Sequence, residues 1–125
     1  MTQRLKKIDA KAADRLMKDG ALMVDVREPG EYARVRIPGS HNAALSRIGV
    51  SELPLGPEQA VVFFCASGNR TTMYESHLAA KAGAAEAYVM QGGIAAWSGA
   101  GLPVESGRAE GDPEPRSLFG RMFGR

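Results

Sequence analysis

The single cysteine of the chain, Cys65, lies where a nucleophile could be activated. It follows the most apolar run of the sequence, residues 60–64, and precedes a segment of small residues that ends in Arg70. Small residues let successive backbone N–H groups turn inward around an anion, and arginine supplies a planar set of donors for an oxyanion. A helix N-terminus or a nearby arginine can lower the pKa of a thiol from about 8.5 to roughly 3.5–7.5, which yields the nucleophilic thiolate.

We therefore predict that Cys65 is the catalytic nucleophile and that the loop after it binds an anionic substrate. The substrate-binding residues in this prediction are Ala66, Ser67, Gly68, Asn69 and Arg70. The competing interpretation is that Cys65 is only a small buried apolar residue, as free cysteines often are. Its position between an apolar run and a glycine-containing loop favours the nucleophile. No metal or other cofactor is expected at this site.

The elements that position this loop are predicted from hydrophobic patterning. Short apolar runs bounded by turn formers predict strands over residues 21–26, 60–64 and 86–90. Helical spacing predicts helices over residues 10–18 (capped by Asp9), 29–36, 71–81 and 94–98, while residues 42–48 fit neither pattern. Strands that alternate with helices indicate an α/β domain with a parallel sheet of about four or five strands and helices on both faces. Cys65 would then lie at the carboxyl edge of the sheet, where such folds bind ligands.

Composition and length restrict the class of protein. With 125 residues, 44% hydrophobic and 24% charged, the chain suits one globular domain, which we place at residues 1–105. A net charge of +2 is too small to indicate a nucleic-acid partner. One cysteine excludes an internal disulfide and a C-x-x-C redox pair, and it fits a reducing compartment.

The sequence predicts no membrane-spanning segment and no secretory signal. No run of roughly 18 apolar residues is present, and the N-terminal segment lacks the apolar core of a secretory signal, so we expect a cytoplasmic protein. Residues 106–125 are expected to be a disordered tail. Its last residues combine arginines with the apolar side chains of Leu118, Phe119, Met122 and Phe123. This end is either a frayed terminus or a segment that docks on a partner groove or an anionic membrane surface.

Three segments of the sequence, which together cover about residues 5–105, resemble a single-domain rhodanese. Residues 24–32 and 37–42 resemble the signature D-V-R-E-x-x-E-Y-x-x-G-H-I-P-G-A-x-N, and residues 65–70 resemble the active loop C-x-x-G-x-R. Residues 92–97 and 101–103 resemble the closing signature G-G-x-x-x-W…G-x-P. The chain departs from the pattern at Val35 and Arg36, which replace Gly-His, and at Ser40, which replaces alanine.

The resemblance implies a thiosulfate sulfurtransferase with a rhodanese-like three-layer fold. Cys65 would take the sulfane sulfur of thiosulfate or a similar small anionic donor, and the resulting persulfide would pass it to a thiophilic acceptor. The backbone amides of residues 66–70 would cradle the persulfide, and Arg70 would help to hold the donor. Because the chain has no second cysteine, the acceptor must be an external thiol or protein.

Two other functions remain open. The domain could be a sulfur-relay or regulatory binding module with little turnover. It could also be a phosphatase or an arsenate reductase, which we rank last. Related enzymes of that kind have a loop one residue longer, whereas the segment from Cys65 through Arg70 has six residues.

Other polar and aromatic residues are assigned structural roles. Asp25, Arg27 and Glu31 are expected to form a network of salt bridges and hydrogen bonds that shapes the wall of the site. His77, two turns beyond Cys65, is a weak candidate for a catalytic base. His41 is expected to be exposed, and Trp97 is expected to pack in the core.

Overall fold

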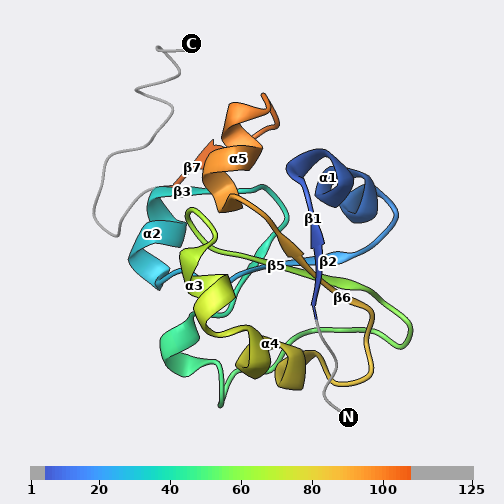
Figure 1. Ribbon diagram of the computed structural model, residues 1–125. Coiled ribbons are helices and arrows are strands. Elements are labelled where there is room, and N and C mark those ends of the chain that lie inside the picture. The colour runs from blue at the N-terminus through green and yellow to red at the C-terminus, as the bar shows by residue number, and fades with distance from the viewer. Residues whose placement is uncertain (1–4, 108–125) are drawn as a thin grey trace.

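The centre of the structure is a five-stranded parallel sheet whose strands lie in the order β1-β6-β5-β2-β4 (Figure 1). The computed structural model describes residues 5–107. The strands are β1 (Lys6–Ile8), β2 (Leu22–Asp25), β4 (His41–Asn42), β5 (Val61–Phe64) and β6 (Ala87–Met90). Every neighbouring pair is parallel, which confirms the predicted α/β sheet.

Helices cover both faces of this sheet, as predicted (Figure 1). Helices α1 (Ala10–Lys18) and α5 (Gly93–Gly99) contribute buried residues to the core on one face. Helix α4 (Glu75–Ala82), preceded by the short α3 (Asn69–Met73), contributes to the core on the other face. Helix α2 (Pro29–Arg34) and the 3-10 helix η1 (Leu45–Arg47) belong to the connection between β2 and β5.

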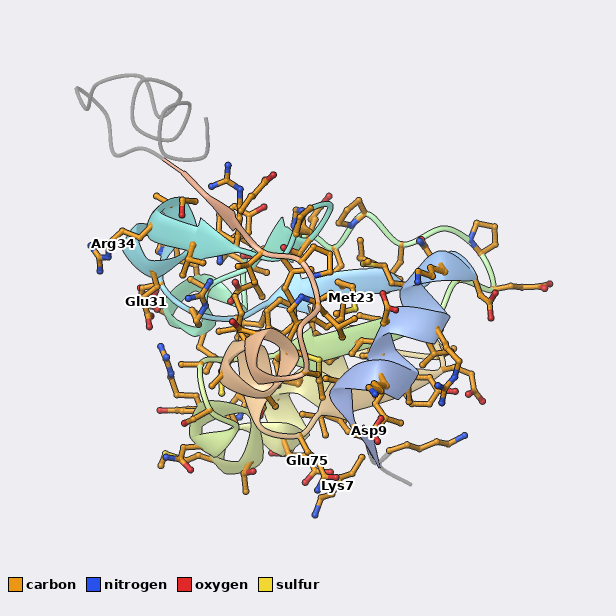
Figure 2. All side chains as sticks on the ribbon, turned by 90° about the horizontal axis from the view of Figure 1, so that it is seen from above. Lys7, Asp9, Met23, Glu31, Arg34 and Glu75 are labelled. Atoms are coloured by element: carbon orange, nitrogen blue, oxygen red, sulfur yellow. The ribbon has the colours of Figure 1, made fainter. Side chains whose placement is uncertain are left out.

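The two cores explain why β5 is apolar along its whole length. Successive side chains of a strand point to opposite faces of the sheet. Phe63 packs in the cluster that contains Leu78 of α4, and Phe64 packs in the cluster that contains Trp97 of α5. Met23 of β2, labelled in Figure 2, lies in the second cluster and is 1% exposed. Because both faces are covered by helices, the sheet needs continuous apolar runs rather than alternating ones.

The predicted elements differ from the observed ones mainly at the short strands, which have two or three residues each. Strands β1 and β4 were not predicted, because the three residues of β1 and the two of β4 are too few for a pattern. The predicted helix over residues 29–36 ends at Arg34. The next two residues form β3 (Val35–Arg36), which pairs with β7 (Glu105–Ser106) in a separate antiparallel ribbon. Glu105 and Ser106, at the start of the polar C-terminal segment, are therefore part of this ribbon, and residues 108–125 lie outside the described residues.

The helix predicted over residues 71–81 is two helices. The first begins at Asn69, within the last two residues of the cysteine loop, and the chain turns at Tyr74, whose φ of −109° and ψ of 25° are not helical. The predicted cap of α1 is confirmed, since Asp9 Oδ1 accepts a hydrogen bond from the Ala12 N–H at 2.8 Å. Among residues 5–107, no helix has the length and apolar character needed to cross a membrane.

Candidate active site

Cys65 lies at the end of β5, where the chain turns into α3 (Figure 1). The thiol is enclosed, with only 1% of the residue exposed. The backbone N–H of Gly68 donates a hydrogen bond to Cys65 Sγ at 3.1 Å, and Thr71 Oγ1 lies 3.8 Å from the same sulfur. Gly68 reaches this position with a φ of +103°, which glycine adopts without the steric cost that other residues pay.

The surroundings of Cys65 lower the pKa of its thiol. Burial acts in the opposite direction and raises the pKa, since it penalises the charged thiolate. Hydrogen bonds from the backbone N–H groups of Thr71, Gly68 and Arg70, together with the Thr71 hydroxyl, outweigh burial. The net lowering increases the share of nucleophilic thiolate at neutral pH.

Thr71 is a site residue that the sequence analysis missed. Its side chain is 1% exposed, contacts Cys65 Sγ and donates a hydrogen bond to the Gly68 carbonyl at 3.1 Å. The sequence feature that could have indicated Thr71 is a hydroxyl side chain in the first turn of the helix that begins at the loop.

The loop is held from outside by the start of α5. The N–H groups of Ile94 and Ala95 donate hydrogen bonds to the carbonyls of Cys65 and Ala66 at 2.9 and 3.0 Å. The two backbones approach so closely that a Cβ at Gly93 would overlap both carbonyls. Gly92 and Gly93 also have positive φ values of +79° and +60°. The Gly-Gly pair, which opens the closing signature of the sequence, therefore allows α5 to bind the carbonyl groups of the loop. The N–H groups of the loop are then free to turn toward the sulfur.

The side chain of Arg70 is paired with a carboxylate. Its Nη1 and Nη2 donate to Glu31 Oε1 and Oε2 at 2.8 and 3.0 Å. Glu31 Oε1 also accepts the N–H of Glu28 at the start of α2, at 3.0 Å. The side-chain hydrogen bond from Arg70 is the main cause that lowers the pKa of Glu31 from 4.5 to about 2. In this structure both terminal nitrogens of Arg70 face Glu31, and its contact with a donor stays a prediction.

The expected network of Asp25, Arg27 and Glu31 is divided into two ion pairs. Arg27 is 3% exposed and Asp25 is fully buried, and Arg27 Nη2 donates to Asp25 Oδ2 at 2.7 Å. The same nitrogen donates to the Val35 carbonyl at 2.6 Å. Through these two hydrogen bonds Arg27 connects the end of β2 with the start of β3, so we assign the pair a structural role. Glu31 belongs to the other pair, with Arg70.

Within residues 5–107, the remaining candidates form no hydrogen bond with Cys65 Sγ. His77 is exposed on α4 and makes an edge contact with Tyr74, with ring centroids 5.7 Å apart. His41 in β4 is half-buried rather than exposed. Trp97 is fully buried and donates from Nε1 to the Pro103 carbonyl at 2.7 Å, which confirms core packing. Within residues 5–107, no group of three or more His, Cys, Asp or Glu side chains is arranged to hold a metal ion.

Two curated relatives show how the chain compares in sequence. It is 36% identical over 86 residues to the uncharacterized protein slr1261 of Synechocystis, an alignment that covers 69% of this chain and 48% of that protein. The chain thus spans about half the length of this relative. It is 29% identical over 109 residues to thiosulfate sulfurtransferase GlpE of Pseudomonas fluorescens, which covers 87% of this chain and 96% of the relative.

Solved structures show the same fold. A rhodanese-related protein from Thermoplasma volcanium superposes with a TM-score of 0.69 at 27% identity, over 80% of this chain and 97% of the other. A protein of unknown function from Rhodopseudomonas palustris, described as a possible tyrosine phosphatase, superposes with a TM-score of 0.62 at 30% identity, over 81% and 85% of the two chains.

The match to a family model covers most of the described domain. The model of the Rhodanese-like domain matches residues 9–100, which include the cysteine loop and the Gly-Gly start of α5. The chain belongs to the rhodanese-like domain family.

Proposed function

We propose that this protein is a sulfurtransferase that moves a sulfane sulfur from thiosulfate, or a similar small anionic donor, to a thiophilic acceptor. The observation that carries the proposal is the position of Cys65 Sγ. It lies inside a loop whose backbone N–H groups face it and lower the pKa of its thiol. Membership of the rhodanese-like family and similarity to a protein named thiosulfate sulfurtransferase support the same activity.

The first half of the reaction loads the cysteine. The Cys65 thiolate attacks the outer sulfur of thiosulfate, the bond between the two sulfurs of the donor breaks, and sulfite leaves with the electron pair of that bond. The product is an anionic Cys65 persulfide. The N–H groups that lower the pKa of the thiolate are suited to stabilise this anion as well, because both carry negative charge on sulfur.

The second half unloads the cysteine to a molecule outside the chain. A thiol acceptor attacks the terminal sulfur, and Cys65 leaves as the thiolate. This is two-step covalent catalysis, for which ping-pong kinetics are the expected pattern. A protein with a single cysteine in this cycle suits a reducing compartment such as the cytoplasm. Small thiols and protein thiols are both candidate acceptors.

Mass spectrometry of the intact protein after incubation with thiosulfate tests the proposal. We expect an added mass of one sulfur atom on Cys65 that disappears on incubation with a thiol. We expect no adduct and no turnover in Cys65→Ser. Turnover that persists in Cys65→Ser, or an unmodified wild-type protein, contradicts the proposal.

The same preparation separates the other two functions. A stable persulfide with negligible steady-state transfer to thiols indicates a relay or regulatory module. Hydrolysis of a phenyl phosphate that depends on Cys65 indicates a phosphatase. We include this test because the similar protein from Rhodopseudomonas palustris is described as a possible tyrosine phosphatase. The six-residue segment from Cys65 through Arg70 leads us to expect no such hydrolysis.

A further inference from the structure

A groove of about 230 Å³ runs beside the cysteine loop, and neither Arg70 nor Glu31 is part of its lining. It lies between the loop with the start of α3, on one side, and the ends of β6 and β1 on the other. Its polar lining includes Lys7, Ser67, Asn69, Thr72 and Gln91. Figure 2 shows Lys7 and Glu31 on different sides of the domain, so the groove is separate from the Arg70–Glu31 pair.

The groove and the cysteine share two residues of the loop. Gly68 and Thr71 both line the groove. Gly68 also donates its N–H to Cys65 Sγ at 3.1 Å, and Thr71 Oγ1 lies 3.8 Å from that sulfur. A molecule bound in the groove is therefore next to the residues that hold the reactive sulfur.

Four exposed polar side chains that line the groove have no partner among the described residues. Among the residues that the structure describes, the side chains of Lys7, Ser67, Asn69 and Gln91 form no hydrogen bond or ion pair with one another or with other residues. Within residues 5–107, the Lys7 ammonium forms no ion pair, so it is an uncompensated cation in the lining of the groove.

The chemistry of these side chains indicates a ligand with a carboxylate and amide groups. The Lys7 ammonium offers donors to a carboxylate, the Ser67 hydroxyl both donates and accepts, and the amides of Asn69 and Gln91 complement a peptide group. The oxygens of a thiosulfate ion accept hydrogen bonds, but the ion has no N–H group to donate to the carbonyl oxygens of Asn69 and Gln91. The Arg70 side of the loop differs, because its guanidinium already faces Glu31.

We propose that this groove binds the carboxylate-bearing portion of a small peptide-like thiol, which is the acceptor of the sulfur on Cys65. The proposal rests on the sulfurtransferase function above. With the ligand seated beside Gly68 and Thr71, its thiolate attacks the terminal sulfur of the Cys65 persulfide. The bond between the two sulfurs of the persulfide breaks, Cys65 leaves as the thiolate, and the acceptor departs as an anionic persulfide, so the charge of the transferred sulfur moves with it.

The kinetic test compares a charged and an uncharged thiol as acceptors. Protein loaded with thiosulfate is reacted with glutathione or with 2-mercaptoethanol, in the wild type, Lys7→Met, Lys7→Glu and the control Lys11→Met. Lys11 is exposed on α1, outside the groove. We expect the KM for glutathione to rise about 3-fold in Lys7→Met, as befits one exposed ion pair, and further in Lys7→Glu. The KM for 2-mercaptoethanol should stay unchanged, and the difference between thiols should shrink in high salt.

A binding experiment gives a readout that does not depend on turnover. S-methylglutathione, which cannot accept sulfur, is titrated into Cys65→Ser and followed by the amide NMR signals. On addition of S-methylglutathione, we expect the amide signals of Ser67, Asn69 and Gln91 to shift in Cys65→Ser. We expect smaller shifts in the double variant that carries both Cys65→Ser and Lys7→Met.

The outcomes separate this inference from the proposed function. If Cys65 never gains sulfur from thiosulfate but S-methylglutathione still shifts the groove signals, the function fails and the groove stands as a thiol-binding site. If Cys65 is loaded normally and Lys7→Met affects both thiols equally or neither, the acceptor site is overturned. Slower loading by thiosulfate in Lys7→Met assigns the groove to the donor and also overturns it.

Discussion

Arg70 and Glu31, which are 39 residues apart in the sequence, form a two-point ion pair at the edge of the cysteine loop, with distances of 2.8 and 3.0 Å. The pair connects α2 to the residue that ends the loop. The N–H of Arg70 is one of the groups that lower the pKa of Cys65, so the same residue contributes its backbone to the sulfur and its side chain to Glu31.

The first prediction concerns the acid stability that this pair confers. The pKa of Glu31 is lowered from 4.5 to about 2 in the folded protein, with the hydrogen bond from Arg70 as the main cause. A lowered folded-state pKa stabilises the protein above pH 4.5, and the contribution is lost as the pH falls from 4.5 toward 2. Because both side chains are about one-third exposed, we expect a contribution of no more than about 1 kcal/mol.

Glu31→Gln should therefore flatten the dependence of unfolding free energy on pH in this range. Urea denaturation at a series of pH values measures the unfolding free energy of the variant and of the wild type. Glu52→Gln is the control, since Glu52 is exposed and has no ion pair within the described residues. A variant whose stability falls with acid as steeply as that of the wild type contradicts the prediction.

The second prediction concerns the contact between α5 and the loop. Gly93→Ala should destabilise the protein by about 3 kcal/mol or more, because a Cβ there overlaps the carbonyls of Cys65 and Ala66 and the φ is positive. Gly99 is the matched control at the other end of α5, where a Cβ meets nothing within 4 Å and the φ is not positive. We expect Gly99→Ala to be neutral or stabilising, by at most about 1 kcal/mol. Thermal unfolding checks both, and similar melting temperatures for the two variants would contradict the close contact.

The third prediction concerns the hydroxyl of Thr71. Thr71→Val removes a group that lowers the pKa of Cys65, so we expect this pKa to rise and the alkylation of Cys65 at neutral pH to slow. Thr72→Val is the matched control. Its hydroxyl also bonds to the Gly68 carbonyl, at 2.8 Å, but it has no contact with the sulfur. The pH dependence of the iodoacetamide reaction measures the effect, and equal profiles for the two variants would exclude a role of the Thr71 hydroxyl.

The fourth prediction concerns the buried pair of Asp25 and Arg27. Asp25→Asn leaves the Arg27 guanidinium, only 4% exposed, without its counter-ion. Loss of one partner of a buried pair costs about 3–5 kcal/mol. By contrast, Asp14→Asn breaks the pair with Lys18, whose side chain is 72% exposed, and should cost about 0–1 kcal/mol. Chemical denaturation of both variants gives the comparison, and equal losses would show that the buried charge is not the cause.

The sequence by itself determined the central strands, the order of alternating elements and the place of Cys65 in the fold. The apolar runs of β2, β5 and β6 are local features, because a strand covered on both faces needs apolar side chains along its whole length. Cys65 follows the most apolar of them directly, so its position at the carboxyl edge of the sheet follows from chain connectivity alone.

Only the tertiary structure decided the partners of the loop. Arg70 pairs with Glu31, which α2 brings across from another part of the chain, and its contact with a donor stays a prediction. The carbonyls of Cys65 and Ala66 are bound by N–H groups of α5, and Lys7 reaches the loop from an edge strand too short to be predicted. Each of these contacts joins segments distant in sequence. The spacing of apolar residues along the sequence predicts the type of each element and its buried face. Which residues of separate elements come into contact depends on how the elements pack, and the sequence pattern does not give this.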